Sequence, residues 1–286
     1  MRFRIVMVCM ILLLVTKAFS QQKNKITIRS MLLAPTNDVV LVAAHRGVQS
    51  SFPENSIAGI QRALDIGADI VEIDVRLTKD EIPVLMHDDD IDRTTNGSGS
   101  LNKFTLAELQ SFRLVDTLVH AQEFKIPTLE EVLKLETGDA FFYLDLKNSL
   151  KELDVILEKV MEMKASDRVI FYVKDYSSVM KIRKLMPDAF IMKKVYHTPE
   201  FKNDLKKFTP NVIHLGDNQE EREVAYINEL VPYNKVLNVN SMKKTDPMAR
   251  QSMDVYSDLV EKKVNIILTD YPEILLKYLR SIEKHN

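Results

Sequence analysis

Short apolar runs alternate along the chain with longer segments in which apolar residues recur every three or four positions. Most of the runs are almost continuously apolar, which is typical of parallel strands covered on both faces. We interpret these runs as strands at Val39–His45, Ile70–Leu77, Phe141–Lys147, Val169–Val173, Phe190–Val195, Val212–Leu215, Val236–Asn240 and Asn265–Thr269. Helical patterns lie between most of them, for example at Ser56–Ile66, Leu150–Met163, Ser177–Leu185 and Gln251–Lys262.

This alternation predicts the α/β class and one (β/α)8 TIM-type barrel, which we place at residues 39–286 after an N-terminal segment at 21–38. An open, doubly wound sheet has the same alternation, so the order of elements alone does not exclude it. The chain has no long linker rich in Pro, Gly or Ser that would separate a second domain.

One apolar run breaks the rhythm. Pro83–His87 follows Ile70–Leu77 with no room for a helix, so the two strands must be antiparallel and form a hairpin. Folding about residues 79–81 places Asp74 roughly opposite Met86 and His87. Residues 91–127 then form a small excursion before the next strand of the barrel.

Two capping boxes mark helix starts in and after this excursion. Thr105 is followed by Glu108, and Thr128 is followed by Glu131, in the spacing that lets each side chain bond the other's backbone. Each pair therefore predicts the first turn of a helix.

The N-terminus has the pattern of a signal peptide at residues 1–20. Arg2 and Arg4 precede the apolar run Ile5–Val15, which is too short to cross a membrane, and small residues flank Phe19. The pattern predicts export to the periplasm or the exterior, with no stable membrane insertion after cleavage near Gln21. An uncleaved membrane anchor is the alternative interpretation.

Composition excludes several classes of function. The formal net charge is −2, so there is no basic excess of the kind that nucleic-acid-binding proteins show. The only cysteine, Cys9, lies in the predicted signal peptide. The mature chain would therefore have no thiol catalysis, no zinc–thiolate site and no disulfide.

Charged side chains gather at predicted strand ends, and the carboxyl ends of parallel barrel strands open on one rim, where barrel active sites lie. The residues concerned are His45, Arg46, Glu72, Asp74, His87, Asp145, Lys147 and Asp270. Taken singly, a histidine here is more often structural, and Asp145 with Lys147 could be an ion pair. Buried charges are costly unless they are paired or bind metal, so the whole set indicates a functional site.

The chemistry of the set points to phosphate. Three carboxylates, Glu72, Asp74 and Asp145, make an all-oxygen site that suits Ca²⁺ or Mg²⁺. Arg46 and Lys147 suit a phosphate group. Histidines change charge near neutrality and serve as general acids and bases, so the set predicts phosphoryl transfer or phosphodiester cleavage.

The motifs that carry these residues resemble those of the glycerophosphodiester phosphodiesterase family, from about residue 39 to 283. The resemblance implies a barrel and metal-dependent hydrolysis of small glycerophosphodiesters to glycerol 3-phosphate and an alcohol. The motifs are His45-Arg46-Gly47, Pro53-Glu54-Asn55-Ser56, Glu72-Ile73-Asp74-Val75, Pro83-Val84-Leu85-Met86-His87-Asp88, Arg93-Thr94-Thr95, Ile126-Pro127-Thr128-Leu129-Glu130-Glu131 and Thr269-Asp270-Tyr271-Pro272.

The resemblance also implies a role for each residue. His45 and His87 would be the acid/base pair, and attack by the glycerol 2-hydroxyl through a cyclic phosphate would fit them. Arg46 and Lys147 would bind the phosphate, and Glu54 and Asp270 would support the site. The metal ligands would be Glu72, Asp74 and Asp145.

Three positions depart from the family pattern. Asp145 stands where the third metal ligand is usually glutamate. The late motif usually contains a tryptophan, whereas this chain has none and reads Leu237-Asn238-Val239-Asn240 there. Glu81 stands at the hairpin turn in place of glycine.

Two further interpretations stay open. The same site could cleave phospholipids or other phosphodiesters, or it could bind phosphate without turnover, although both histidines are present. We expect His197 and His214 to be structural or to line the pocket. Nothing in the sequence indicates an oligomeric state or the alcohol group of the substrate.

Overall fold

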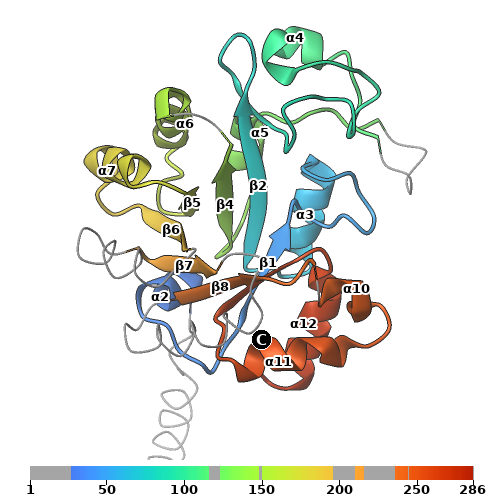
Figure 1. Cartoon of the computed structure of the whole chain (residues 1–286), viewed down its shortest axis with the longest axis vertical. Helices are drawn as coiled ribbons and strands as arrows, with labels where there is room; N and C mark the ends of the chain where they lie inside the picture. Colours follow the sequence, from blue (N-terminus) through green and yellow to red (C-terminus); the bar gives the residue numbers. More distant parts are fainter. Residues whose placement is uncertain are drawn as a thin grey trace, which may run out of the picture.

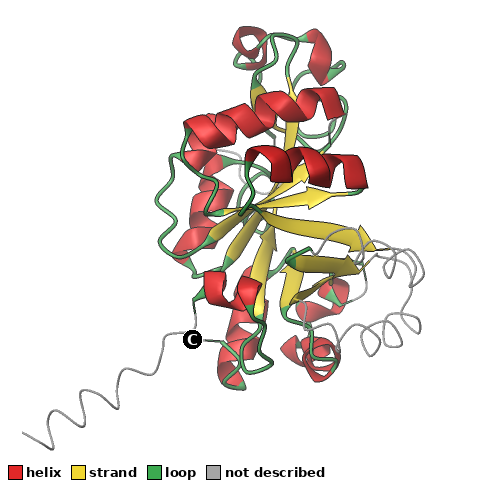
Figure 2. Ribbon diagram, turned by 90° about the vertical axis from the view of Figure 1, so that its left-hand side faces the viewer, coloured by secondary structure: helices red, strands yellow, loops and turns green. Residues whose placement is uncertain are grey.

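Eight parallel strands close into a barrel in the computed structural model, which describes residues 27–115, 123–147, 150–195, 210–215, 236–243 and 245–285. Strand β1 pairs with both β2 and β9, so the sheet closes on itself and is not an open, doubly wound sheet. Figures 1 and 2 show helices around this barrel. The barrel strands are β1 (Leu41–His45), β2 (Ile70–Leu77), β4 (Phe141–Leu146), β5 (Val169–Val173), β6 (Phe190–Val195), β7 (Val212–Leu215), β8 (Val236–Asn240) and β9 (Ile266–Thr269).

Alternation along each strand separates the barrel interior from the surrounding helices. Alternate residues such as Leu41, Ala43 and Ile70 are buried inside the barrel, while their neighbours pack against the outer helices. The outer helices include α3 (Ile57–Asp65), α6 (Leu150–Glu162), α7 (Tyr176–Leu185) and α12 (Pro272–Ser281).

A short helix closes the amino-terminal end of the barrel. Helix α2 (Ile28–Leu33) starts at a capping box between Thr27 and Ser30, and it buries Met31 and Leu32 against the interior residues. Apolar side chains therefore fill this end of the interior, whereas the charged strand-end residues lie at the opposite end of the barrel.

The hairpin prediction is confirmed. Strand β3 (Pro83–Leu85) pairs antiparallel with β2, and the Met86 N–H donates to the Asp74 carbonyl at 3.1 Å. Glu81, in the turn, has a φ of 60°, the left-handed conformation that favours glycine. Because this chain has glutamate and not glycine there, a residue with a side chain adopts this strained backbone conformation.

The excursion carries short helices and its own small core. Both predicted capping boxes are present, at the start of α4 (Leu106–Leu109) and of α5 (Leu129–Leu133). A 3-10 turn, η1 (Leu101–Lys103), precedes α4. Buried residues that include Met86 and Ile91 pack beneath these turns and attach the excursion to the hairpin.

One predicted helix is wrong in its continuity. The segment predicted as Gln251–Lys262 consists of a 3-10 turn, η3 (Met253–Tyr256), followed by α11 (Ser257–Glu261), and α10 (Asp246–Ala249) precedes it. The Tyr256 hydroxyl donates to a buried Asp246 oxygen at 2.9 Å. We attribute the break to this anchor, which ties the end of the 3-10 turn to α10.

Within the residues that the structure describes, no helix combines the length and apolar character needed to cross a membrane. The predicted signal peptide at residues 1–20, His120 and His197 lie outside the described residues.

Candidate active site

The predicted strand-end residues meet at the carboxyl end of the barrel. The strand register sets His45 beside Glu72 and Asp74 beside Asp145. They border a pocket of about 220 Å³ whose lining includes His45, Arg46, Glu72, Asp74, His87, Asp145 and Lys147. Glu54 and Asp270 do not line this pocket but bond residues that do.

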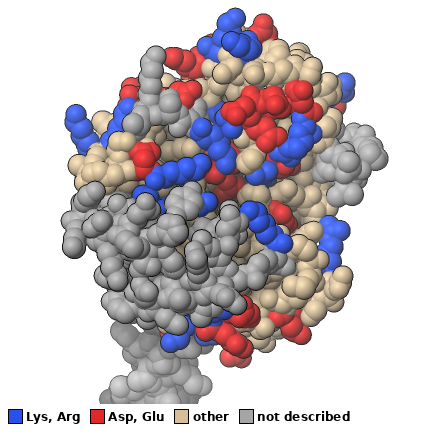
Figure 3. All heavy atoms as spheres, viewed as in Figure 1, with Lys and Arg blue, Asp and Glu red and all other residues tan. Residues whose placement is uncertain are grey.

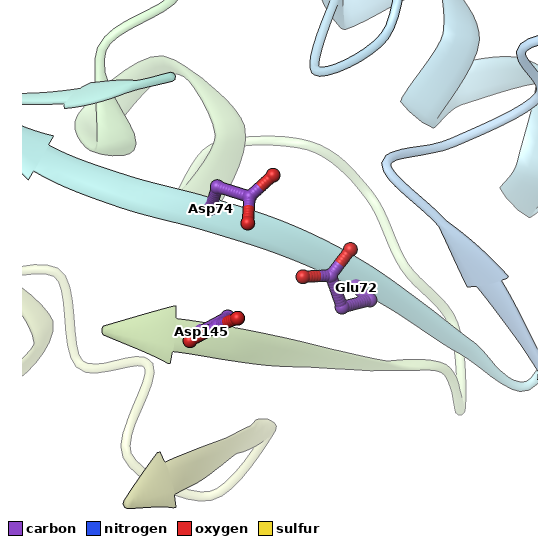
Figure 4. A group of neighbouring side chains, drawn as sticks. All are labelled: Glu72, Asp74 and Asp145. Carbon is purple, nitrogen blue, oxygen red and sulfur yellow. The ribbon is translucent and has the colours of Figure 1, made fainter. Parts of the chain in front are cut away.

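Three carboxylates converge in this mouth. Glu72 and Asp74 project from β2 and Asp145 from β4, as Figure 4 shows, and one oxygen from each lies within 4.8 Å of the others. Burial raises the pKa of Glu72, and the adjacent charges of Asp74 and Asp145 raise it further. Burial opposes ionisation of Asp74 too, but Arg46 and Lys147 outweigh it and lower the pKa of Asp74.

A divalent cation fits this group. Asp145 Oδ1 is buried and has no hydrogen-bond partner among the described residues, so a donor or a cation is missing beside it. The ligand atoms would all be carboxylate oxygens, which hard cations such as Ca²⁺ and Mg²⁺ prefer. A cation would also offset the repulsion that Asp74 and Asp145 exert on an ionised Glu72.

Arg46 is held by three carboxylates. Its backbone N–H donates to Glu72 Oε2 at 3.1 Å, its Nη1 to Glu54 Oε1 at 3.0 Å, and its Nε forms an ion pair with Asp74 Oδ2 at 2.9 Å. The turn that allows this needs Gly47, because a Cβ there would lie 2.6 Å from the Gly59 carbonyl carbon.

His45 is oriented by a carboxylate from the last barrel strand. Its Nδ1 lies 2.7 Å from Asp270 Oδ1, and the Gln49 amide donates to the same Asp270 oxygen at 2.8 Å. The Asp270 N–H in turn donates to buried Asp246 at 2.7 Å. These contacts leave His45 Nε2 as the nitrogen that faces the acidic group, 4.0 Å from Glu72 Oε2.

His87 is oriented by a different device. Its Nδ1 lies 2.6 Å from Asp88 Oδ1, and Arg93 Nε donates to the other Asp88 oxygen at 2.6 Å. Arg93 also donates two hydrogen bonds to the Glu54 carboxylate, at 2.7 and 2.9 Å. Because Glu54 also bonds Arg46, one chain of hydrogen bonds joins His87 to Arg46.

Lys147 and Asn55 complete the surroundings of Asp74. Lys147 Nζ forms an ion pair with Asp74 Oδ1 at 3.0 Å and contacts Asp145. Asn55 donates its amide to Asp74 Oδ2 at 2.9 Å and accepts the Asp74 N–H at 3.1 Å. Asp74 is therefore fixed on both oxygens.

Aromatic side chains form another wall of the pocket. Tyr143 packs against Tyr172, and Tyr172 meets the His214 ring edge-on at 5.4 Å. His214 is buried, lines the pocket and bonds the Asn238 amide at 2.6 Å, which agrees with the expected lining role.

Several residues that the structure ties to the site had no role predicted from the sequence: Gln49, Asn55, Asp88, Arg93 and Asp246. Asn55, Asp88 and Arg93 belong to the quoted motifs, and that adjacency was the available signal. For Gln49 and Asp246 the sequence contains no such signal, because both contact Asp270, which only the fold brings beside them.

At the carboxyl end of a parallel barrel, the structure brings together three carboxylates that suit a divalent cation, two cationic side chains held by ion pairs and two oriented histidines. This combination defines the class of barrel hydrolases suited to phosphate esters. The particular family follows from comparison with known proteins.

The model of the Glycerophosphoryl diester phosphodiesterase family matches residues 45–272. The glycerophosphodiester phosphodiesterase of Bacillus altitudinis is 31% identical over 239 residues, covering 79% of this chain and 97% of that protein. A glycerophosphoryl diester phosphodiesterase structure from Parabacteroides distasonis has a TM-score of 0.77 at 25% identity, covering 88% of this chain and 90% of that one. The phosphodiesterase of Oleispira antarctica, solved with sn-glycerol-3-phosphate as product, has a TM-score of 0.72 at 23% identity, covering 85% of this chain and 97% of that one.

This chain therefore belongs to the glycerophosphodiester phosphodiesterase family of enzymes, which hydrolyse glycerophosphodiesters. The match confirms the resemblance found in the motifs.

Proposed function

We propose that the enzyme hydrolyses glycerophosphodiesters with the help of one divalent cation, Ca²⁺ or Mg²⁺, and two acid/base histidines. The observation that carries the proposal is the paired orientation of His45 and His87. Each has Nδ1 tied to a carboxylate, which leaves Nε2 to exchange a proton with substrate.

The two imidazoles would divide the proton transfers. One accepts the proton of the attacking hydroxyl, either the glycerol 2-hydroxyl or water, and the other donates a proton to the oxygen of the departing alcohol. If the glycerol hydroxyl attacks, the product of this step is a cyclic phosphate. Water then opens that ring with the histidine roles reversed, which restores both protonation states.

Two cationic side chains, those of Arg46 and Lys147, would hold the phosphate. The Arg46 guanidinium is fixed by Glu54 and Asp74, and Lys147 by Asp74 and Asp145, so neither must reorganise when negative charge develops on the phosphate oxygens. Glu54 and Asp270 act through Arg46 and His45, and we assign them positioning roles.

Glu72, Asp74 and Asp145 would hold the cation, with Asp145 as the shorter third ligand. When bound, such an ion polarises a phosphate oxygen and offsets the charge of the transition state. The product in the Oleispira antarctica structure, sn-glycerol-3-phosphate, supports the direction of cleavage that we propose here.

The test is product analysis on glycerophosphocholine and glycerophosphoglycerol, run beside a lysophospholipid. We expect glycerol 3-phosphate and the free alcohol from the first two. Faster cleavage of the lysophospholipid would favour a phospholipase. Binding of glycerol 3-phosphate without turnover of any substrate would favour a non-catalytic barrel.

The proposal extends to export. Residues 1–20 have the composition of a signal peptide, so the mature enzyme would act in the periplasm or outside the cell on small diesters. Mass spectrometry of protein from the exported fraction should find Gln21 or a close neighbour as its first residue. An N-terminus at Met1 in that fraction would contradict cleavage.

A further inference from the structure

Three lysines lie in one row across neighbouring strands at the barrel mouth. The register sets Asp145 beside Tyr172 and Tyr172 beside Met192. Two residues beyond these positions come Lys147, directly after β4, Lys174, directly after β5, and Lys194, within β6. A spacing of two keeps a side chain on the same face of an extended segment. All three line the mouth pocket.

The members of this lysine row differ in their surroundings. Lys147 is neutralised by Asp74 and Asp145. Lys174 is exposed, and none of the carboxylates that the structure describes forms an ion pair with it. The adjacent Asp175 is occupied as the cap of α7, where it accepts the Ser178 N–H and hydroxyl, both at 2.8 Å.

Lys174 and Lys194 follow Val173 and Lys193, which are register partners, so the two lysines occupy neighbouring positions on the rim. An anion bound at Lys174 would offset a charge that none of the described carboxylates pairs with, and both lysines line the pocket in which that anion would lie.

The charge of the pocket points the same way. Its lining contains three carboxylates and four cationic side chains, and a divalent cation on the acidic group would add two positive charges. A phosphodiester brings a single negative charge. Figure 3, in the view of Figure 1, shows acidic side chains near the centre of this face with Lys and Arg around them.

There is also space beside Lys174. A second hollow of about 110 Å³ opens toward α7 and is lined by Lys147, Tyr172 and Lys174, which also line the mouth pocket. A substrate whose phosphate lies at Arg46 and Lys147 could therefore extend a further group toward Lys174.

We propose that Lys174 and Lys194 form a subsite for a second anionic group, a phosphate or a carboxylate, on the alcohol part of the substrate. The proposal rests on the function proposed above and narrows its substrate class. Lysine binds such groups as a point charge, so the subsite would favour anionic alcohols and disfavour cationic ones such as choline.

The experiment measures kcat/KM for four diesters: glycerophosphoinositol 4-phosphate, glycerophosphoserine, glycerophosphoglycerol and glycerophosphocholine. The readout is the ratio of each value to that for glycerophosphoglycerol. The variants are Lys174→Gln and Lys194→Gln. Lys184→Gln is the matched control, since Lys184 is an exposed lysine of α7 that does not line either pocket.

We expect the wild-type ratio to exceed one for a phosphate or a carboxylate alcohol and to fall about tenfold in Lys174→Gln, as expected for the loss of one charge-assisted contact. Lys194→Gln should act in the same direction, and Lys184→Gln should match wild type. The two anionic substrates show which anion the subsite prefers.

Equal ratios for all alcohols in wild type, or a Lys174→Gln ratio equal to wild type, would overturn the subsite. Absence of glycerol 3-phosphate from every diester would instead overturn the proposed function, so the two failures are distinguishable. Circular dichroism of each variant establishes that it is folded.

Discussion

The charged side chains on the two sides of the barrel mouth are arranged in different ways. On the side of β1, β2 and β4, charged residues are cross-linked: Asp74 alone contacts Arg46, Lys147 and Asn55. On the side of β5 and β6, the lysine row places Lys174 and Lys194 side by side, and Lys174 meets no carboxylate among the described residues. We call these the acidic half and the basic half.

This difference separates the side chains that would serve the reaction with every substrate from those that would select among substrates. Charges that stabilise a transition state act best when they are held in place beforehand, which the ion pairs of the acidic half achieve. A site that accepts varied groups uses side chains that can adjust to each of them. Changes in the acidic half should therefore reduce turnover of all substrates, whereas changes in the basic half should alter preference among them.

The largest effect should follow removal of a histidine from the acidic half. His45→Ala or His87→Ala should each lower kcat by about 10²–10⁴-fold, because each removes one of the two proposed proton carriers. The double variant should lose little more, since the two act as a unit. His285→Gln, at a histidine that pairs with Asp69 outside the mouth pocket, is the control. More than a tenth of wild-type activity in His45→Ala would contradict its role.

The next effect concerns Asp145, the proposed metal ligand at which the chain departs from the family pattern. Asp145→Asn should weaken Ca²⁺ or Mg²⁺ binding at least about tenfold by calorimetry, because it removes one of three carboxylate charges. Asp145→Glu should keep activity, with a changed preference between the two ions. Unchanged affinity in Asp145→Asn would place the third ligand elsewhere.

A smaller loss should follow Arg46→Lys, which keeps the charge but loses the fork that reaches Glu54 and Asp74 together. We expect kcat/KM to fall about tenfold for anionic and neutral alcohols alike. That uniform loss is what distinguishes the acidic half from the basic half. If only the anionic substrates were affected, the comparison between the halves would fail.

The smallest expected effect is on the free energy of unfolding, and this effect depends on pH. Hydrogen bonds from Arg93, assisted by His87, lower the pKa of Asp88 to about 2, below its unfolded value. A lowered folded pKa stabilises the protein above the unfolded pKa, and this contribution is lost as the pH falls through the folded pKa. Because Asp88 is partly exposed, we expect less than about 1 kcal/mol.

Denaturant unfolding of wild type and Asp88→Asn measures this contribution. The difference in free energy of unfolding should be largest near neutral pH and shrink between about pH 4 and about pH 2. A difference that does not change with pH would show that the Asp88 charge contributes nothing to stability.

Local patterns predicted the fold well, because strand, turn and cap signals depend on neighbours in sequence. The β2–β3 hairpin and the capping boxes at Thr105 and Thr128 are confirmed. The helix expected at Gln251–Lys262 is interrupted, since the Tyr256 hydroxyl bonds Asp246 in the core, and no local pattern reports such an anchor.

The candidate site was predictable in its strand-end residues for the same reason. The contacts that orient them were not. Arg93 donates to Glu54, which lies 39 residues earlier in the chain, and the lysine row depends on the register between β5 and β6. Such relations join residues far apart in sequence, so periodicity and motif spacing do not contain them.

The most direct test of the account is a metal titration of product release. Wild-type enzyme is treated with a chelator and assayed for glycerol 3-phosphate from glycerophosphoglycerol while Ca²⁺ or Mg²⁺ is restored. We predict no turnover without the ion, recovery that saturates at one ion per chain, and a midpoint that moves to higher concentration in Asp145→Asn. Full activity after chelation, or the same midpoint in both proteins, would contradict a cation held by Glu72, Asp74 and Asp145.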